Sequence, residues 1–110
     1  MHRLLISLFA AVCVVACCPT PTEVLLLQAE ECMAEQPDSA RAILQAMDLS
    51  LTRKPELVAR HALFEAQLLI EQENPIYPDS LLKRALAYYA DHDKPAKYRA
   101  RAYFYAGHSY

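Results

Sequence analysis

His61 and Glu65, four residues apart, come nearest to a metal site among the residues of this chain that could do chemistry. No third ligand stands near them in the sequence, so we expect a solvated or capped histidine. Glu30, Glu31 and Glu35 could supply a general acid and base, but nothing apolar is placed to raise the pKa of one of them. We interpret these glutamates as a solvated helix face, and we expect no metal and no cofactor.

Serine nucleophiles and glycine-rich loops are also missing. Ser39 and Ser80 each follow Pro-Asp, where the start of a helix explains their type. Gly107 is the only glycine of the 110 residues, which excludes dinucleotide fingerprints, Walker loops and nucleophile elbows, because each needs several residues free to take positive φ. The sequence therefore predicts a protein that is not an enzyme.

Composition favours helices packed around one core. Hydrophobic residues make up 55% of the chain and charged residues 22%, which argues against disorder. Alanine and leucine are abundant, whereas β-branched residues are few after residue 17, so local propensity favours helix over strand. A chain of 110 residues is long enough for one domain only. The expected fold class is all-α.

Prolines divide the chain after residue 22 into five segments with helical apolar spacing. The expected helices span residues 24–35, 39–47, 56–71, 80–90 and 96–110. Asp38, Asp79 and Asp93 are the expected N-caps of the second, fourth and fifth helices.

The beginning of the chain has the pattern of an export signal. A basic residue, Arg3, precedes an apolar run over residues 4–15, which is too short to span a bilayer. The run ends in Val14-Val15-Ala16-Cys17, which resembles the lipobox of bacterial lipoproteins. This resemblance implies that residues 1–16 are a signal peptide and that Cys17 is acylated with a fatty acid such as palmitate. Residues 17–22 would then be a short tether. The alternatives to lipidation are an ordinary signal peptidase site near Ala16 or a buried apolar helix.

Lipidation would leave too few cysteines for a disulfide framework. Cys13 would leave with the signal peptide, and Cys17 would carry the lipid. Cys32 lies on the first expected helix, where we interpret it as a small buried apolar residue; pairing with Cys18 is the alternative.

An internal repeat appears when the sequence is shifted by 41 residues against itself. Pro37-Asp38-Ser39 then falls on Pro78-Asp79-Ser80, and Ala59-Arg60 falls on Ala100-Arg101. The matches continue with large residues over large and small over small, so the repeat is a packing pattern. It indicates a repeated helical hairpin.

The last expected helix carries Tyr103, Ala106-Gly107 and Tyr110 at the spacing of the pattern W-x-x-L-G-x-x-Y. By this motif, and by Ala85, Tyr89 and Pro95 before it, the chain resembles the tetratricopeptide repeat (TPR) family. The third helix departs from the motif and keeps only its small and last apolar positions, Ala66 and Leu69.

The resemblance implies that residues 23–110 form a TPR-like array of about 2.5 helical hairpins. Ala66 and Gly107 would let a neighbouring helix approach closely, and Tyr89 and Tyr103 would fill the space beside them.

Arg60 and Arg101 occupy the same place in successive repeats, 41 residues apart. In TPR proteins this place lines the concave face, so the resemblance implies a ligand-binding role. Glu56 stands four residues before Arg60 and predicts an ordinary surface pair, whereas Lys97 stands four before Arg101 and repels it. Arg101 is therefore the stronger candidate, for an acidic ligand. Where the carboxylate-clamping members have their basic and amide residues, this chain has Leu63, Gln67, Phe104 and His108, so the resemblance does not extend to their peptide specificity.

Aromatic residues crowd toward the end of the chain at helical spacing. Packing in the core is their expected role, and a binding platform is the alternative. Only some of the rings can point back at the fourth helix, so we expect at least one or two to face solvent. The set is Tyr98, Tyr103, Phe104, Tyr105 and Tyr110. The exposed rings would support self-association through the last helix or capture by a partner, or they would indicate a truncated array. We favour truncation, because no second helix follows the motif of the last helix.

We therefore expect a non-catalytic, lipid-anchored protein of the bacterial cell envelope, periplasmic or surface-facing, that binds or organises other proteins. Export and a net charge of −2 argue against nucleic acid as a partner. The alternative is an N-terminal sensory or regulatory input module of a longer TPR-containing signalling protein.

Overall fold

The structure, a computed structural model, describes residues 20–72 and 78–108. In these ranges it contains only helices: α2 (Pro21–Cys32), α3 (Pro37–Ala46), the short 3-10 helix η1 (Leu49–Leu51), α4 (Pro55–Glu71), α5 (Asp79–Tyr89) and α6 (Ala96–His108). The all-α prediction is confirmed. Each of the five expected helices corresponds to an observed α-helix, and η1 was not expected.

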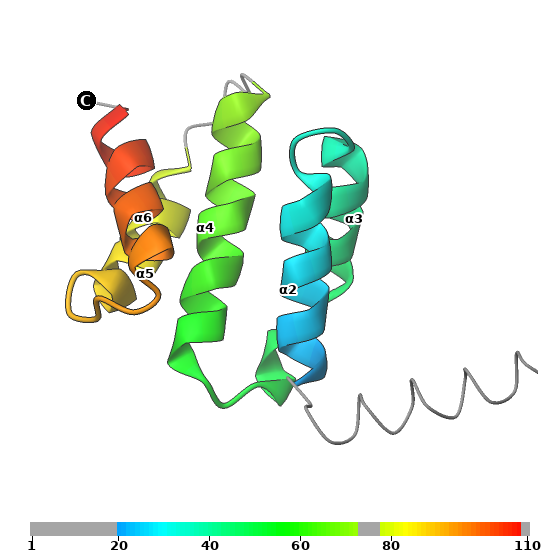
Figure 1. Cartoon of the computed structure of the whole chain (residues 1–110), viewed down its shortest axis with the longest axis horizontal. Helices are drawn as coiled ribbons and strands as arrows, with labels where there is room; N and C mark the ends of the chain where they lie inside the picture. The colour runs from blue at the N-terminus through cyan, green and yellow to red at the C-terminus, as the bar shows by residue number, and fades with distance from the viewer. Residues whose placement is uncertain (1–19, 73–77, 109–110) are drawn as a thin grey trace, which may run out of the picture.

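The helices alternate in direction along the chain (Figure 1). α2 packs against α3, α4 packs against α5, and α6 packs against both α4 and α5. α4 lies between the two outer pairs and also contacts α2 and α3. Nine residues of α4 are buried, against two in α2 and two in α3, so α4 is the centre of the core.

Proline is the first residue of three helices, at Pro21, Pro37 and Pro55. Its fixed φ suits the first helical turn, where its missing N–H would have no partner. The hydroxyl of Thr20 accepts a hydrogen bond from the backbone N–H of Glu23 at 3.3 Å and caps α2. Residues 21–22, expected at the end of the tether, are therefore helical.

The expected aspartate caps are wrong. The N-cap of α3 is Gln36 and that of α5 is Pro78, so Asp38 and Asp79 lie inside the first turn of their helices. Asp93 lies three residues before α6 begins. The first two carboxylates are still at the positive end of a helix dipole, which favours acidic residues without a capping bond.

The core is made of aliphatic and aromatic side chains from all five α-helices. Its largest members are less than 2% exposed: Leu26, Leu44, Leu57, Leu63, Phe64, Tyr89 and Tyr98. Cys32 is half-buried and packs against this core, and Cys18 lies outside the described residues.

Two of the four packing positions expected from the TPR resemblance are wrong. Ala66 and Tyr89 are fully buried, as expected. Tyr103, however, is 48% exposed, and a Cβ added at Gly107 would meet no atom within 4 Å. No described helix packs on this side of α6, so Tyr103 does not pack against a neighbouring helix and Gly107 does not allow one to approach closely.

The aromatic side chains of α6 divide between core and solvent. Tyr98 and Tyr105 are buried, whereas Tyr103 and Phe104 are exposed, the latter by 62%. The expectation that at least one or two rings face solvent is confirmed. Tyr110 lies outside the described residues.

None of the described helices has the length and apolarity needed to cross a bilayer. The expected signal peptide, Cys17 and the first residues of the tether, which together cover residues 1–19, lie outside the described residues.

Candidate functional site

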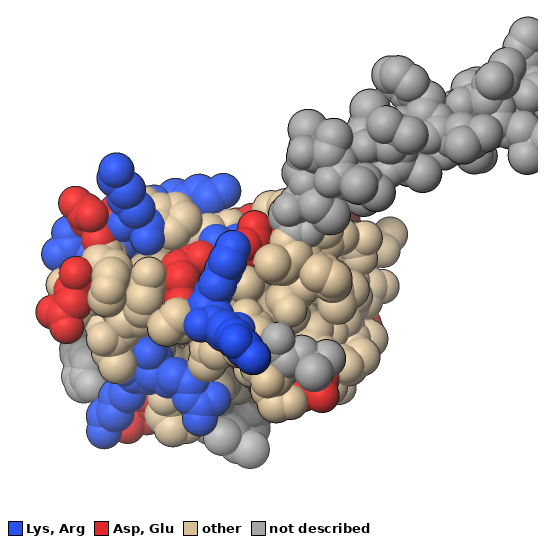
Figure 2. All heavy atoms as spheres, turned by 90° about the horizontal axis from the view of Figure 1, so that it is seen from below, with Lys and Arg blue, Asp and Glu red and all other residues tan. Residues whose placement is uncertain are grey.

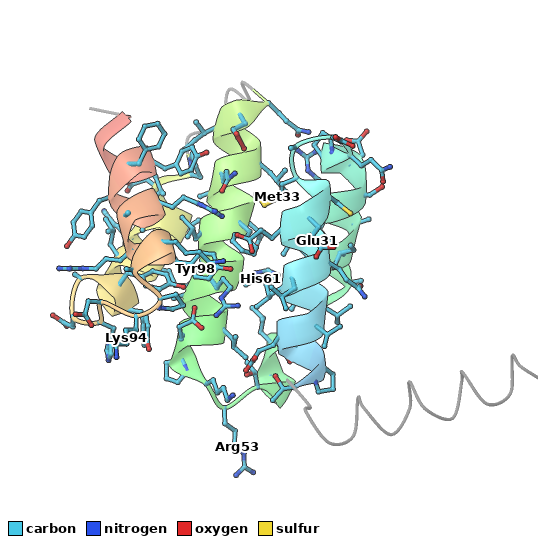
Figure 3. The ribbon with its side chains drawn as sticks, in the orientation of Figure 1. Glu31, Met33, Arg53, His61, Lys94 and Tyr98 are labelled. Atoms are coloured by element: carbon cyan, nitrogen blue, oxygen red, sulfur yellow. The ribbon has the colours of Figure 1, made fainter. Side chains whose placement is uncertain are left out.

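Both candidate arginines lie in one polar cluster, where α2, α4 and α6 come together around the ring of Tyr98 (Figure 3). We call it the arginine cluster. Its members are Glu30 of α2, Glu56 and Arg60 of α4, Tyr89 of α5, and Tyr98 and Arg101 of α6.

Arg60 is held by Glu56, the partner expected one turn before it. Nε of Arg60 donates to Oε2 of Glu56 at 2.9 Å, and Nη2 donates to Oε1 of the same carboxylate. The hydroxyl of Tyr89 donates to Oε2 as well, at 2.5 Å. The predicted pairing of Arg60 with Glu56 is confirmed. It is not an ordinary surface pair, because the two side chains are only 11% and 17% exposed.

Burial and this carboxylate set the ionisation of the buried half of the cluster. Burial opposes the charge of Arg60, but the hydrogen bonds and charge of Glu56 hold the pKa of the guanidinium above its ordinary value. Burial, followed by the neighbouring carboxylate, raises the pKa of Tyr89. Arg60 therefore stays cationic and Tyr89 stays a hydrogen-bond donor at physiological pH.

Arg101 is held by Glu30, which comes from the other end of the described chain. Nη1 of Arg101 donates to Oε2 of Glu30 at 3.0 Å, and the hydroxyl of Tyr98 donates to Oε1 at 2.8 Å. Burial and the hydrogen bond to Glu30 raise the pKa of Tyr98 to about 12. The interpretation of Glu30 as part of a solvated face is therefore wrong, because its carboxylate ties α2 to α6.

The ring of Tyr98 lies between cations and is 1% exposed. The guanidinium carbon of Arg60 lies 4.5 Å from the ring centroid, Nζ of Lys97 lies 4.9 Å from it, and the guanidinium carbon of Arg101 lies 5.4 Å from it. A cation over an aromatic face is attracted by the ring quadrupole. Phe64 meets the ring edge-on at 5.6 Å. Tyr98 thus fixes the positions of both arginines, a role that the sequence analysis missed.

Arg101 is the accessible cation of the cluster. Its side chain is 28% exposed, against 11% for Arg60. A guanidinium has five N–H donors, and Glu30 uses the Nη1 group of Arg101. The donors that remain can bind a carboxylate or phosphate of a ligand. The arrangement is suited to binding an anion beside an aromatic ring.

A solvated or a capped side chain was expected for His61, and the structure shows the capped one, because the imidazole is buried and contacts a carbonyl near the end of α3. Its Nε2 lies 2.8 Å from the carbonyl oxygen of Leu44, near the end of α3, and its Nδ1 lies 2.8 Å from Oε1 of Glu65. Burial alone would lower the pKa of His61, but these two partners together raise it. Both ring nitrogens are therefore engaged within the protein, and within the described ranges no group of three or more metal-ligating side chains occurs.

A second histidine, His92, interacts with the C-terminal end of α5. Its Nδ1 lies 2.8 Å from the carbonyl oxygen of Tyr88, and its ring stacks on that of Tyr88 at 4.0 Å. The imidazole of His92 thus interacts with a carbonyl at the negative, C-terminal end of the α5 dipole.

Comparisons with known protein families, with curated proteins and with solved structures find no match for this chain. Its function is therefore inferred from its own residues and from the geometry of the arginine cluster.

Proposed function

We propose that this protein is a TPR-like lipoprotein of the bacterial cell envelope, anchored through an acylated Cys17, which binds an acidic protein or peptide at the arginine cluster. It acts without catalysis and without a cofactor, as a binding or scaffolding protein.

The packing of the hairpins supports a repeat array. α2 and α4 each begin a helical hairpin, and α6 follows in the position where a third would begin. α4 contacts α2 on one side and α6 on the other, so the first helices of successive units are neighbours. In stacked helical hairpins, equivalent helices line one extended face, which such proteins use for binding.

The observation that carries the proposal is the meeting of Glu30, Arg60 and Arg101 from three such helices at one place. Arg60 and Arg101 are equivalent in the 41-residue repeat, yet only Arg101 is accessible. A carboxylate of the ligand would bind the open donors of Arg101 beside Tyr98 and compete with Glu30 for the guanidinium.

Capture of a partner tests the binding role. The intact lipoprotein is used as bait in native envelope extract, and the affinity of a captured protein is then measured with variants. Arg101→Ala should weaken binding about tenfold or more, because it removes a charged hydrogen bond to the ligand. Arg41→Ala, on α3 and outside the cluster, is the matched control and should change little. Equal affinities of the wild type and Arg101→Ala would remove the proposed site.

Metabolic labelling with a fatty acid tests the anchor. The wild type and Cys18→Ser should both carry label, whereas Cys17→Ser should carry none. Label at full level on Cys17→Ser would contradict the proposed anchor.

A further inference from the structure

Large apolar side chains are exposed on the first two turns of α2. Val24, Leu25 and Leu27 are 38%, 37% and 42% exposed, and no described helix covers them. We call these three residues the α2 apolar face. Contiguous exposed apolar residues of this kind mark a contact with a lipid surface or with another molecule.

The surface of α2 changes character along the helix. Beyond the α2 apolar face the exposed residues include two glutamates, Glu31 in the last turn (Figure 3) and Glu35 just after the helix. Seen from the end at which α2 begins, the half of the molecule under α2 and α3 is largely uncharged, whereas charged side chains gather over the other half (Figure 2). The apolar surface is thus confined to the end of α2 that follows the tether.

Basic side chains lie beside the same end. Arg53 and Lys54 are exposed and line a hollow together with Thr20 and Thr22. The side chain of Arg53 points away from the body of the protein (Figure 3). Nζ of Lys54 lies 2.8 Å from Oε1 of Glu23, the one acidic residue in the first turn of α2, so this carboxylate is neutralised. This end therefore keeps a net positive charge beside apolar groups, the combination that fits anionic headgroups over acyl chains.

The covalent chain limits how far this end can stand from an anchor at Cys17. Three residue steps separate Cys17 from Thr20, and at 3.8 Å a step they span at most about 11 Å. Leu27 lies about 10 Å along the helix axis from Thr20, at 1.5 Å per residue. The α2 apolar face therefore cannot leave the neighbourhood of a bilayer that holds the acyl chains.

We propose that the α2 apolar face rests in the headgroup region of the bilayer that anchors Cys17, with Arg53 against the lipid phosphates. This inference rests on the proposed acylation of Cys17 and adds to it which side of the domain faces the lipid. A second copy or a partner protein could also cover leucines, but the short tether keeps these leucines within about 20 Å of the anchoring bilayer. The arginine cluster, reached through α6, would then remain open to a ligand in the aqueous phase.

Tryptophan fluorescence tests this orientation, because the chain has no tryptophan of its own. Leu27→Trp reports on the α2 apolar face, and Phe104→Trp, at an exposed position of α6, is the matched control. Each acylated full-length variant is reconstituted into vesicles of phosphatidylethanolamine and phosphatidylglycerol, with and without phospholipid brominated on its acyl chains. The emission of Leu27→Trp should shift to shorter wavelength and be mostly quenched by the brominated lipid, while Phe104→Trp should keep its emission. Leu25→Trp repeats the test if Leu27→Trp does not fold.

The other outcomes separate this inference from the anchor. Variants that float with the vesicles but show equal quenching at both positions would overturn the orientation and leave the anchor intact. Variants that do not float and carry no acyl mass would overturn both. A blue shift of Leu27→Trp that grows with protein density, without quenching by brominated lipid, would assign the face to a second copy and overturn the proposal.

Discussion

Replacing His61 with leucine should destabilise the protein by about 2–3 kcal/mol at mildly acidic pH, since a hydrogen bond to a charged group contributes about 1.5–3 kcal/mol. The imidazole is 6% exposed and joins α3, through the Leu44 carbonyl oxygen, to Glu65 on α4. Leucine would fill the space but leave the carbonyl and the carboxylate without this partner. Glu65 is 35% exposed and can be solvated, so we do not expect the larger losses seen for fully buried ion pairs.

The effect should depend on pH in a defined direction. The folded state raises the pKa of His61 above its ordinary value of 6.5, because the bonds to Glu65 and the Leu44 carbonyl outweigh burial and the opposing charge of Arg84 on α5. A group whose pKa is raised by folding stabilises the folded state fully below its unfolded pKa and loses that contribution as pH rises through the folded pKa. The difference in stability between the wild type and His61→Leu should therefore shrink from about pH 6 to about pH 9.

Urea unfolding followed by circular dichroism at these two pH values measures this difference, with His92→Leu as the matched control. His92 also contacts a helix-terminal carbonyl, but it is exposed, so its replacement should change stability by less than about 1 kcal/mol. For a domain of this size the His61 variant should melt about 10–20 °C lower. A loss no larger than that of His92→Leu, or a loss that grows with pH, would refute the assignment of His61 as a buried charged cap.

Three further changes test the core and the cluster by the same unfolding assay. Phe64→Ala should lose about 3–5 kcal/mol because the ring is fully buried, whereas Phe104→Ala should change stability by less than about 0.5 kcal/mol; similar losses would contradict the observed division of aromatic residues. Tyr98→Phe should lose about 1 kcal/mol with its hydrogen bond to Glu30, and in the wild type absorbance titration should place one tyrosine pKa near 12; a stability equal to wild type would argue against that bond. Gly107→Ala should stabilise α6 by about 0.5–1 kcal/mol, since nothing obstructs the added methyl group, and destabilisation would mean that this position is covered.

The helices could be predicted from the sequence because their signals are local. Apolar spacing and proline punctuation act within one or two turns, and every expected helix lies within three residues of the observed one where both ends are described. The caps failed for a local reason as well. A proline at the first helical position already starts α3, so Asp38 is displaced into the first turn.

The site was harder to predict because its contacts join distant parts of the chain. The bond between Arg101 and Glu30 spans 71 residues, and neither residue has an oppositely charged residue one turn away that would indicate an ion pair. Arg60, by contrast, was assigned its partner Glu56 because the two are four residues apart. The burial of Arg60, however, depends on α6, which crosses α4 and places the ring of Tyr98 over the guanidinium. The spacing of residues within α4 does not encode this contact.

Equivalent repeat positions differ for the same reason. Leu63 of α4 is fully buried, whereas Phe104, 41 residues later, is 62% exposed, because α4 has neighbours on both sides and no described helix covers that side of α6. A repeat in the sequence predicts equivalent places, but the neighbours of each helix decide which side chains are buried.

The position of a bound ligand on the protein is the most direct test of the proposed function. An acidic peptide from a captured partner, titrated into isotope-labelled protein, should cause its largest NMR shifts at the guanidinium of Arg101 and at Tyr98 and Glu30, and Arg101→Ala should abolish them. Shifts centred on the exposed rings of Tyr103 and Phe104, unchanged by Arg101→Ala, would contradict binding at the arginine cluster.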